Sequence, residues 1–211
     1  MMELHELVHI TTGRIICGSW GSRDFNVWRL SEGCEIKHSN WWLATLAGPL
    51  FSFMLMWAGM ALLFTANIKK QAIGFSLIFA NIPFGRISQV MMGGGDEMVV
   101  ARHLLNTQLS RNSIIILCSI VVLIIGLPPL YRAWRVTLNK KAWVYIFGGL
   151  TLPLAFVLGY VLTALNTILN SGFLAQSFIM GTPIFITLHT ILVVTLLALL
   201  YKNLLLLNRK A

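Results

Sequence analysis

Five long apolar runs dominate the pattern of hydrophobic and polar positions along this chain. They cover residues 41–66, 72–92, 113–130, 143–169 and 178–201, and polar or basic connections separate them. A helix needs about 20 mostly apolar residues to cross the hydrocarbon of a bilayer, and each run is near or above that length. Rings such as Trp41, Tyr131 and Trp143 stand at the ends of runs, where amphipathic aromatic side chains prefer to lie. The pattern predicts five transmembrane helices.

The first forty residues follow a different pattern. Residues 1–12 predict a short helix that ends near Gly13, and twelve residues give about 18 Å of helix, too little to cross a bilayer. Residues 14–20, 23–30 and 34–37 alternate loosely and are separated by turn residues, which predicts three short strands. We therefore expect an all-α polytopic membrane protein with a small membrane-edge β region over 14–40.

Composition supports a single multi-pass domain over residues 1–211. Hydrophobic residues make up 57% of the chain and charged residues 11%, whereas a soluble domain carries roughly 25% charged residues. These values exclude a disordered chain, a disulfide-rich secreted module and an ordinary cytosolic enzyme. The net charge of +9 comes from short basic clusters such as Lys69-Lys70 between the runs, so it predicts loops beside a lipid bilayer and no nucleic-acid partner. The oligomeric state is left open.

The three cysteines show no metal-binding spacing and are odd in number. Cys17, Cys34 and Cys118 are therefore expected to be free thiols that fill space.

With only seven carboxylates in the chain, each one draws attention, and one stands inside an HExxH pattern, His5-Glu6-Leu7-Val8-His9. On a helix, His5 and His9 share a face and can hold one zinc ion, while Glu6 stands where it can take a proton from a water that the metal activates. The alternative is an amphipathic lead-in helix with an exposed polar face. We predict His5 and His9 as metal ligands and Glu6 as the catalytic base.

A catalytic zinc ion usually takes a third protein ligand, and Asp96 is the strongest candidate. It follows Gly93-Gly94-Gly95 at the end of an apolar run, where a glycine-rich break lets a carboxylate approach a metal closely. A plain helix N-cap explains the same placement equally well. His38, His103 and His189 are the remaining histidines; we expect His189 to bond to a neighbouring helix and find no haem pair.

Two helix-breaking patterns fall within the runs. Asn81-Ile82-Pro83 places a polar side chain and a proline inside an apolar run, where the freed backbone groups must be satisfied by protein or face a watery cavity. Gly48-Pro49 loosens the first long run and permits close packing. Ordinary use of glycine and proline in transmembrane helices is the alternative for both.

In their order, these motifs resemble the site-2 protease family of intramembrane zinc metalloproteases. The matching segments are HELVH (5–9), a short β region, AGPLFSFML (47–55), NIP (81–83) and GGGDE (93–97), within the first half of the chain. The resemblance implies Zn²⁺ held by His5, His9 and Asp96, Glu6 as general base, and Asn81 near the substrate or the oxyanion. It also implies that the β region binds an unwound substrate segment by strand addition.

The chain departs from the family pattern in three places. Glu97 follows Asp96 where the family has glycine, which makes it a competing ligand, and Arg86 lies in the interval between Asn81 and Asp96. The HExxH helix lacks preceding apolar residues, so we expect that the chain begins inside that helix or that its N-terminus is re-entrant.

Two indications of orientation disagree. Lysine and arginine divide into six residues on the HExxH side and nine on the other, which favours placing the larger set in the cytoplasm. The family resemblance implies the reverse, with zinc nearer the cytoplasm, and we adopt it as the expectation. The larger set is Lys69, Lys70, Arg132, Arg135, Lys140, Lys141, Lys202, Arg209 and Lys210; the smaller is Arg14, Arg23, Arg29, Lys37, Arg102 and Arg111.

Taken together, the residues and the resemblance predict a membrane-embedded zinc metalloendopeptidase that hydrolyses a peptide bond in or near a transmembrane segment of a membrane-protein substrate. The first alternative is a non-catalytic scaffold or helix-binding regulator of the same fold. The second is a transporter of ions or small solutes that uses Asn81, Arg86 and Asp96 along a polar pathway.

Overall fold

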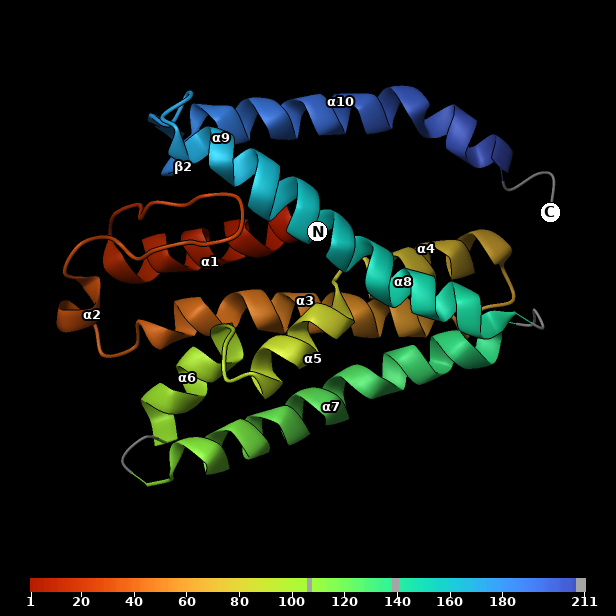
Figure 1. Ribbon diagram of the computed structural model, residues 1–211, viewed down its shortest axis with the longest axis horizontal. Helices are drawn as coiled ribbons and strands as arrows, with labels where there is room; N and C mark the ends of the chain where they lie inside the picture. Colours follow the sequence, from red (N-terminus) through yellow and green to blue (C-terminus); the bar gives the residue numbers. More distant parts are fainter. Residues whose placement is uncertain (106–107, 138–140, 208–211) are drawn as a thin grey trace.

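The computed structural model describes residues 1–105, 108–137 and 141–207, and most of them are helical (Figure 1). The elements in chain order are α1 (Met2–Cys17), α2 (Cys34–Lys37), α3 (Trp42–Leu62), α4 (Ile68–Phe79), α5 (Pro83–Met91), α6 (Asp96–Leu105), α7 (Arg111–Val136), α8 (Ala142–Phe156), the π-helix η1 (Val157–Leu165), α9 (Asn166–Asn170), β1 (Ser177–Ile179), β2 (Thr182–Pro183) and α10 (Ile184–Leu207).

Three helices among the described residues are long and apolar enough to cross a membrane. They are Trp42–Leu62, Arg111–Val136 and the continuous helix Ala142–Asn170, which α8, η1 and α9 form together. They coincide with the first, third and fourth apolar runs. The chain therefore has the build of a membrane protein, but the expectation of five full spans is not confirmed.

The second predicted span, 72–92, is broken into two short helices. Ile82 adopts a left-handed conformation (φ 51°), and Pro83 opens α5 at a position where its missing N–H costs nothing. The Asn81 side chain donates a 2.6 Å hydrogen bond to the Leu77 carbonyl at the end of α4. The polar residue and the proline thus turn one apolar run into α4 and α5.

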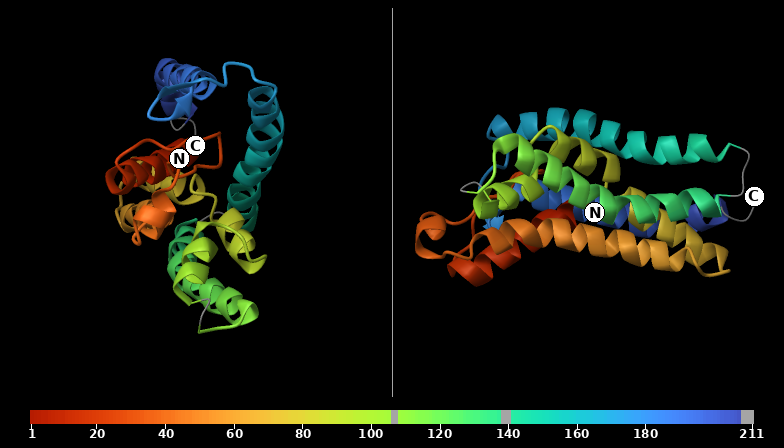
Figure 2. Two further views of the ribbon diagram at one scale, coloured as in Figure 1. Left: turned by 90° about the vertical axis from the view of Figure 1, so that its left-hand side faces the viewer. Right: turned by 90° about the horizontal axis from the view of Figure 1, so that it is seen from below.

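The fifth predicted span, 178–201, is also interrupted, because its first residues form a hairpin. Strands β1 and β2 pair antiparallel, with Ser177 opposite Pro183, and α10 begins directly after β2. The part of α10 with described side chains, Ile184–Leu200, is apolar but shorter than a full span. The helices lie in the order α10, α1, α3 and α7 across the molecule, with α8 to α9 running alongside (Figures 1 and 2).

The prediction of three strands over 14–40 is wrong in most of its detail. Helix α1 continues through Cys17 and ends at Gly18. Gly18 has a φ of 76°, a left-handed conformation that glycine adopts without strain. Cys34–Lys37 is a helical turn, and a single bridge, between Arg23 and Trp28, remains of the β region in the described residues. The small sheet lies instead near the other end of the chain.

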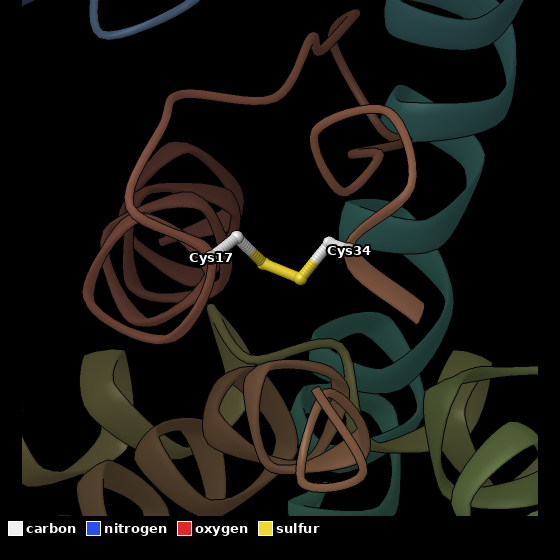
Figure 3. Close-up of a disulfide and its surroundings, with 2 residues drawn as sticks. All are labelled: Cys17 and Cys34. Carbon is white, nitrogen blue, oxygen red and sulfur yellow. A yellow bond between two sulfur atoms is a disulfide. The ribbon is translucent and has the colours of Figure 1, made fainter. Parts of the chain in front are cut away.

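Segment 18–33 folds back over α1 and is fastened there. Arg23 pairs with Glu3, and the Trp28 ring stacks on His9 with 4.8 Å between centroids. A disulfide joins Cys17 at the end of α1 to Cys34 in α2 (Figure 3). The prediction of free thiols is therefore wrong for these two cysteines, which the fold-back brings together, and is confirmed for the buried Cys118.

Helices α3, α5, α6 and α7 enclose an apolar core. Its fully buried members include Met56, Val90, Met98 and Ile114. Close contact between helices also requires glycine: a Cβ on Gly59 of α3 would lie 2.7 Å from the Gly74 carbonyl oxygen of α4. Thus α3 is held between α1, α4, α6 and α7.

Candidate metal centre

His5 and His9 lie one turn apart on the buried face of α1. The His9 side chain is fully buried, and its Nδ1–H donates a 2.7 Å hydrogen bond to the Ala44 carbonyl of α3. That bond fixes the tautomer, so the Nε2 atom carries a lone pair. Metal-ligating histidines are commonly oriented in this way, by donating from the nitrogen that does not bind the metal.

Asp96 reaches the two histidines from the first residue of α6. The chain turns through Gly93 and Gly95, with φ of 78° and 86°, between the end of α5 and this residue. Asp96 Oδ2 lies 3.2 Å from His5 Nε2 and 3.3 Å from His9 Nε2. The Asp96 carboxylate therefore contacts both histidines, as a third ligand of a shared metal ion would.

The three donor atoms are spaced as a small metal ion would space them. His5 Nε2 and His9 Nε2 are 3.0 Å apart, so the triangle has edges of 3.0, 3.2 and 3.3 Å. A tetrahedral ion with bonds of about 2.0–2.1 Å places neighbouring donors about 3.3 Å apart. The Nε2 lone pair of His9 and a carboxylate oxygen face each other across this triangle, and they need a proton or a cation between them.

Gly48 makes the approach of α3 to these side chains possible. A Cβ at this position would lie 2.1 Å from His9 Nε2 and 2.7 Å from His5 Cε1. No side chain fits there without moving the imidazoles. Gly48 thus allows α3 to pack closely against the two histidines of α1.

Glu6 and Asn81 border the same cavity of about 160 Å³, together with His5, Arg86 and Asp96. Glu6 is 5% exposed, and its Oε2 has no hydrogen-bond partner within the described residues. Leu154, Val157 and Leu158 of α8 and η1 form an apolar side of this cavity. The structure therefore brings all five predicted site residues together, His5, Glu6, His9, Asn81 and Asp96.

A second, larger cavity of about 950 Å³ adjoins the first. Glu6 and Asp96 border both cavities, and segment 28–36 lines the second one with polar and charged side chains such as Arg29 and Glu35. The candidate site thus lies between a small cavity with an apolar wall and a larger one whose lining includes charged side chains.

Arg86, which the sequence associated with Asn81 and Asp96 only in the transporter alternative, is a further member of the site. Its guanidinium donates to Glu97 Oε1 (3.0 Å), to Ser52 Oγ (3.0 Å) and to His5 Nδ1 (2.8 Å). Glu97 is thereby engaged in an ion pair, and it lies outside the group of donor atoms that could hold an ion. An ionisable residue within an apolar run was the available signal; Ser52 gave none.

The remaining histidines lie elsewhere. His103 packs edge-on against Trp41, and His189 Nε2 is 3.1 Å from the Tyr160 hydroxyl, which is the neighbouring-helix bond expected of it. His38 follows α2. Among the described residues, the group that could hold a metal is His5, His9 and Asp96.

No family model, no curated protein and no solved structure matches this chain. The resemblance to site-2 proteases therefore stays a prediction from the sequence motifs.

Proposed function

We propose that this protein is a membrane-embedded zinc metalloendopeptidase, similar to the site-2 proteases, that cuts a membrane-protein substrate. The observation that carries the proposal is the triangle of His5 Nε2, His9 Nε2 and Asp96 Oδ2 at 3.0–3.3 Å, formed by residues up to 91 positions apart. Two imidazoles and one carboxylate are a donor set that zinc accepts in catalytic sites with an open fourth position.

The charges around the site favour a divalent cation. Glu6, Asp96 and Glu97 stand against one guanidinium, that of Arg86, so that their fully ionised forms would leave a formal charge of −2 in this buried to half-buried group. Unbalanced charge away from water is costly, so a bound M²⁺ ion would relieve it. Zinc is the proposed ion because nitrogen donors predominate in the triangle.

Each residue has a part in the proposed reaction. Zinc, when bound, supplies Lewis acidity that makes a water nucleophilic near neutral pH. The free carboxylate oxygen of Glu6 accepts the proton of that water and returns it to the leaving amine. Asn81 contacts the unwound substrate from the other side of the cavity. His9, locked by Ala44, and His5, contacted by Arg86 and Ser52, keep the ligand geometry fixed.

One observation favours a second candidate, a non-catalytic membrane protein of the same arrangement. A metal-ligating histidine ordinarily donates from its second nitrogen, but His5 Nδ1 meets the donor Arg86 Nη2 at 2.8 Å. With Nδ1 as acceptor, the ring proton of a neutral His5 sits on Nε2, where it can satisfy Asp96 without a metal. The proposed protease requires the other tautomer of His5, in which Nε2 is free for zinc and the ring proton sits on Nδ1, where Ser52 Oγ at 3.0 Å can accept it.

Metal content separates the two candidates. The full-length protein is purified in detergent, and zinc per chain is measured for wild type, His5→Ala, Asp96→Ala and the control His103→Ala. We expect about one zinc per chain in wild type and control and a loss of most of it in the other two. If the wild-type protein holds no zinc after incubation with Zn²⁺, the protease is ruled out and the non-catalytic candidate remains.

Turnover is then tested in proteoliposomes with a single-span reporter protein as substrate. Glu6→Gln should keep its zinc but lose cleavage by at least about 100-fold, the range that a general base contributes. Exposed Lys70→Gln, which borders neither cavity, is the control and should cleave like wild type. Equal cleavage by Glu6→Gln and wild type would contradict the assigned role.

A further inference from the structure

The disulfide between Cys17 and Cys34 indicates which compartment this end of the molecule faces. The two Cα atoms are 5.4 Å apart, and the bond joins the last turn of α1 to α2, just before α3 (Figure 3). Disulfides persist in oxidising compartments and are rare in the cytosol. Residues 17–34 therefore belong to the side of the membrane that faces away from the cytoplasm.

The charges at the opposite end support the same orientation independently. In Figure 1 the disulfide segment and the β1–β2 hairpin lie at the left end, whereas the α3–α4 connection and the start of α8 lie at the right. Lys69 and Lys70 open α4, Arg132 and Arg135 close α7, and Lys141 precedes α8. In the whole sequence this side carries nine lysines and arginines, against six on the disulfide side. Such clusters are typical of cytoplasmic loops. The sequence adds four further residues to this set: Lys202 lies within α10, and Lys140, Arg209 and Lys210 lie outside the described residues.

The large cavity joins this orientation to the candidate metal centre. It is bordered by Cys34 and by segment 28–36 at the disulfide end, and it extends inward to Glu6 and Asp96. Its lining includes charged side chains such as Arg29, Glu32 and Glu35, which suit a water-filled entrance. The larger of the two cavities at the site thus extends from the candidate metal centre to the disulfide end of the molecule.

We propose that the candidate metal centre faces the oxidising, non-cytoplasmic side and takes its water, its metal ion and its substrate from that side. This inference rests on the proposed function for the word substrate, and it defines the substrate class: a polypeptide presented in the outer half of the bilayer or beyond it, whose cut releases a fragment away from the cytoplasm. It reverses the orientation that the family resemblance implies.

Cysteine labelling tests the orientation without relying on metal or activity. The full chain, carrying Cys118→Ala, is expressed in bacterial inner membranes as either Ser39→Cys or Lys69→Cys; both positions are exposed and lie at opposite ends. Intact spheroplasts are treated with a membrane-impermeant maleimide. We expect Ser39→Cys to be labelled at once and Lys69→Cys only after permeabilisation. Any other pattern in intact spheroplasts (the reverse, both or neither) overturns the inference.

A second arm reads the disulfide itself. Cells expressing the wild-type chain are quenched with acid, alkylated, and analysed by mass spectrometry for free thiols at Cys17 and Cys34. Both should be oxidised, while Cys118 stays free. Reduced Cys17 and Cys34 in quenched cells overturn the inference. A zinc-free or inactive protein with the expected labelling would instead contradict the proposed function alone.

Discussion

At the scale of single residues, the site depends as much on an absent side chain as on the side chains that would hold a metal. Gly48 leaves room for both imidazoles, because a Cβ would meet His9 Nε2 at 2.1 Å, far inside van der Waals contact. Both histidines are held by their neighbours. His9 contacts the Ala44 carbonyl and the Trp28 ring, and His5 contacts Ser52 and Arg86. The imidazoles therefore have little freedom to give way.

Gly48→Ala should lower zinc affinity by more than about tenfold, because the new methyl group displaces the ligand nitrogen itself. Gly126→Ala in α7 is the control, since nothing lies within 4 Å of its Cβ. Isothermal titration of the metal-stripped proteins with Zn²⁺ measures both. Equal affinities for the two variants would show that Gly48 does not shape the site.

At the scale of elements, an apolar run alone was sufficient to predict α3, α7 and the α8–α9 helix. The pattern was insufficient where the end of a helix depends on contacts with residues far away in the sequence. The sequence pattern predicts that the first helix ends near Gly13, yet Gly13 lies inside α1 against Leu30 and Trp28, and Gly18 is the C-cap. The strand prediction for 14–20 failed at that point.

The candidate site was predicted further than its surroundings. HExxH spacing places His5 and His9 on one face of a helix by local geometry alone. Their meeting with Asp96, 91 and 87 positions away, is a tertiary contact, for which the glycine-rich break and the family resemblance were the available signals. Arg86 reaching His5 across 81 positions, and the pairing of Cys17 with Cys34, follow only from how segments fold over one another. Three cysteines permit three pairings, and spacing selects none of them.

The contact between α3 and α4 provides a prediction at the same scale. A Cβ on Gly74 would lie 2.6 Å from the Gly59 carbonyl oxygen, so Gly74→Ala should separate the helices and destabilise the protein by about 1–3 kcal/mol. Gly148→Ala, where the nearest atom is 3.7 Å away, should be neutral or stabilise by up to about 1 kcal/mol. In detergent, the midpoint of thermal unfolding should fall for Gly74→Ala and should stay unchanged or rise for Gly148→Ala. An equal fall in both midpoints would contradict the close contact between α3 and α4.

At the scale of the whole molecule, the candidate metal centre links the first helix to α6. His5 and His9 lie on α1, Asp96 opens α6, and α3 packs against both helices. A ligand that binds only the folded chain stabilises it in proportion to the logarithm of its concentration. An ion at this junction should therefore stabilise the complete fold and not merely the site.

Zinc at about 1,000 times its Kd should stabilise the protein by about 4 kcal/mol, and EDTA should remove that gain. The measurement is the unfolding midpoint by intrinsic tryptophan fluorescence, with and without Zn²⁺. Asp96→Asn, which keeps the size of the side chain but loses its charge, should show little of the shift. A zinc-induced rise of the same size in Asp96→Asn would place the stabilising ion elsewhere.

The separation of His9 from Asp96 along the chain also sets an order of events during synthesis. Asp96 leaves the ribosome 87 residues after His9, a delay on the order of ten seconds at ordinary translation rates. Helix α3 and the segment that becomes α4 and α5 are made in the interval, so the histidine pair waits beside an incomplete site while the membrane is being entered. In the proposed protease, metal capture would consequently be a late step of biogenesis, and a nascent chain arrested before residue 96 would hold two of the three proposed ligands but no finished centre.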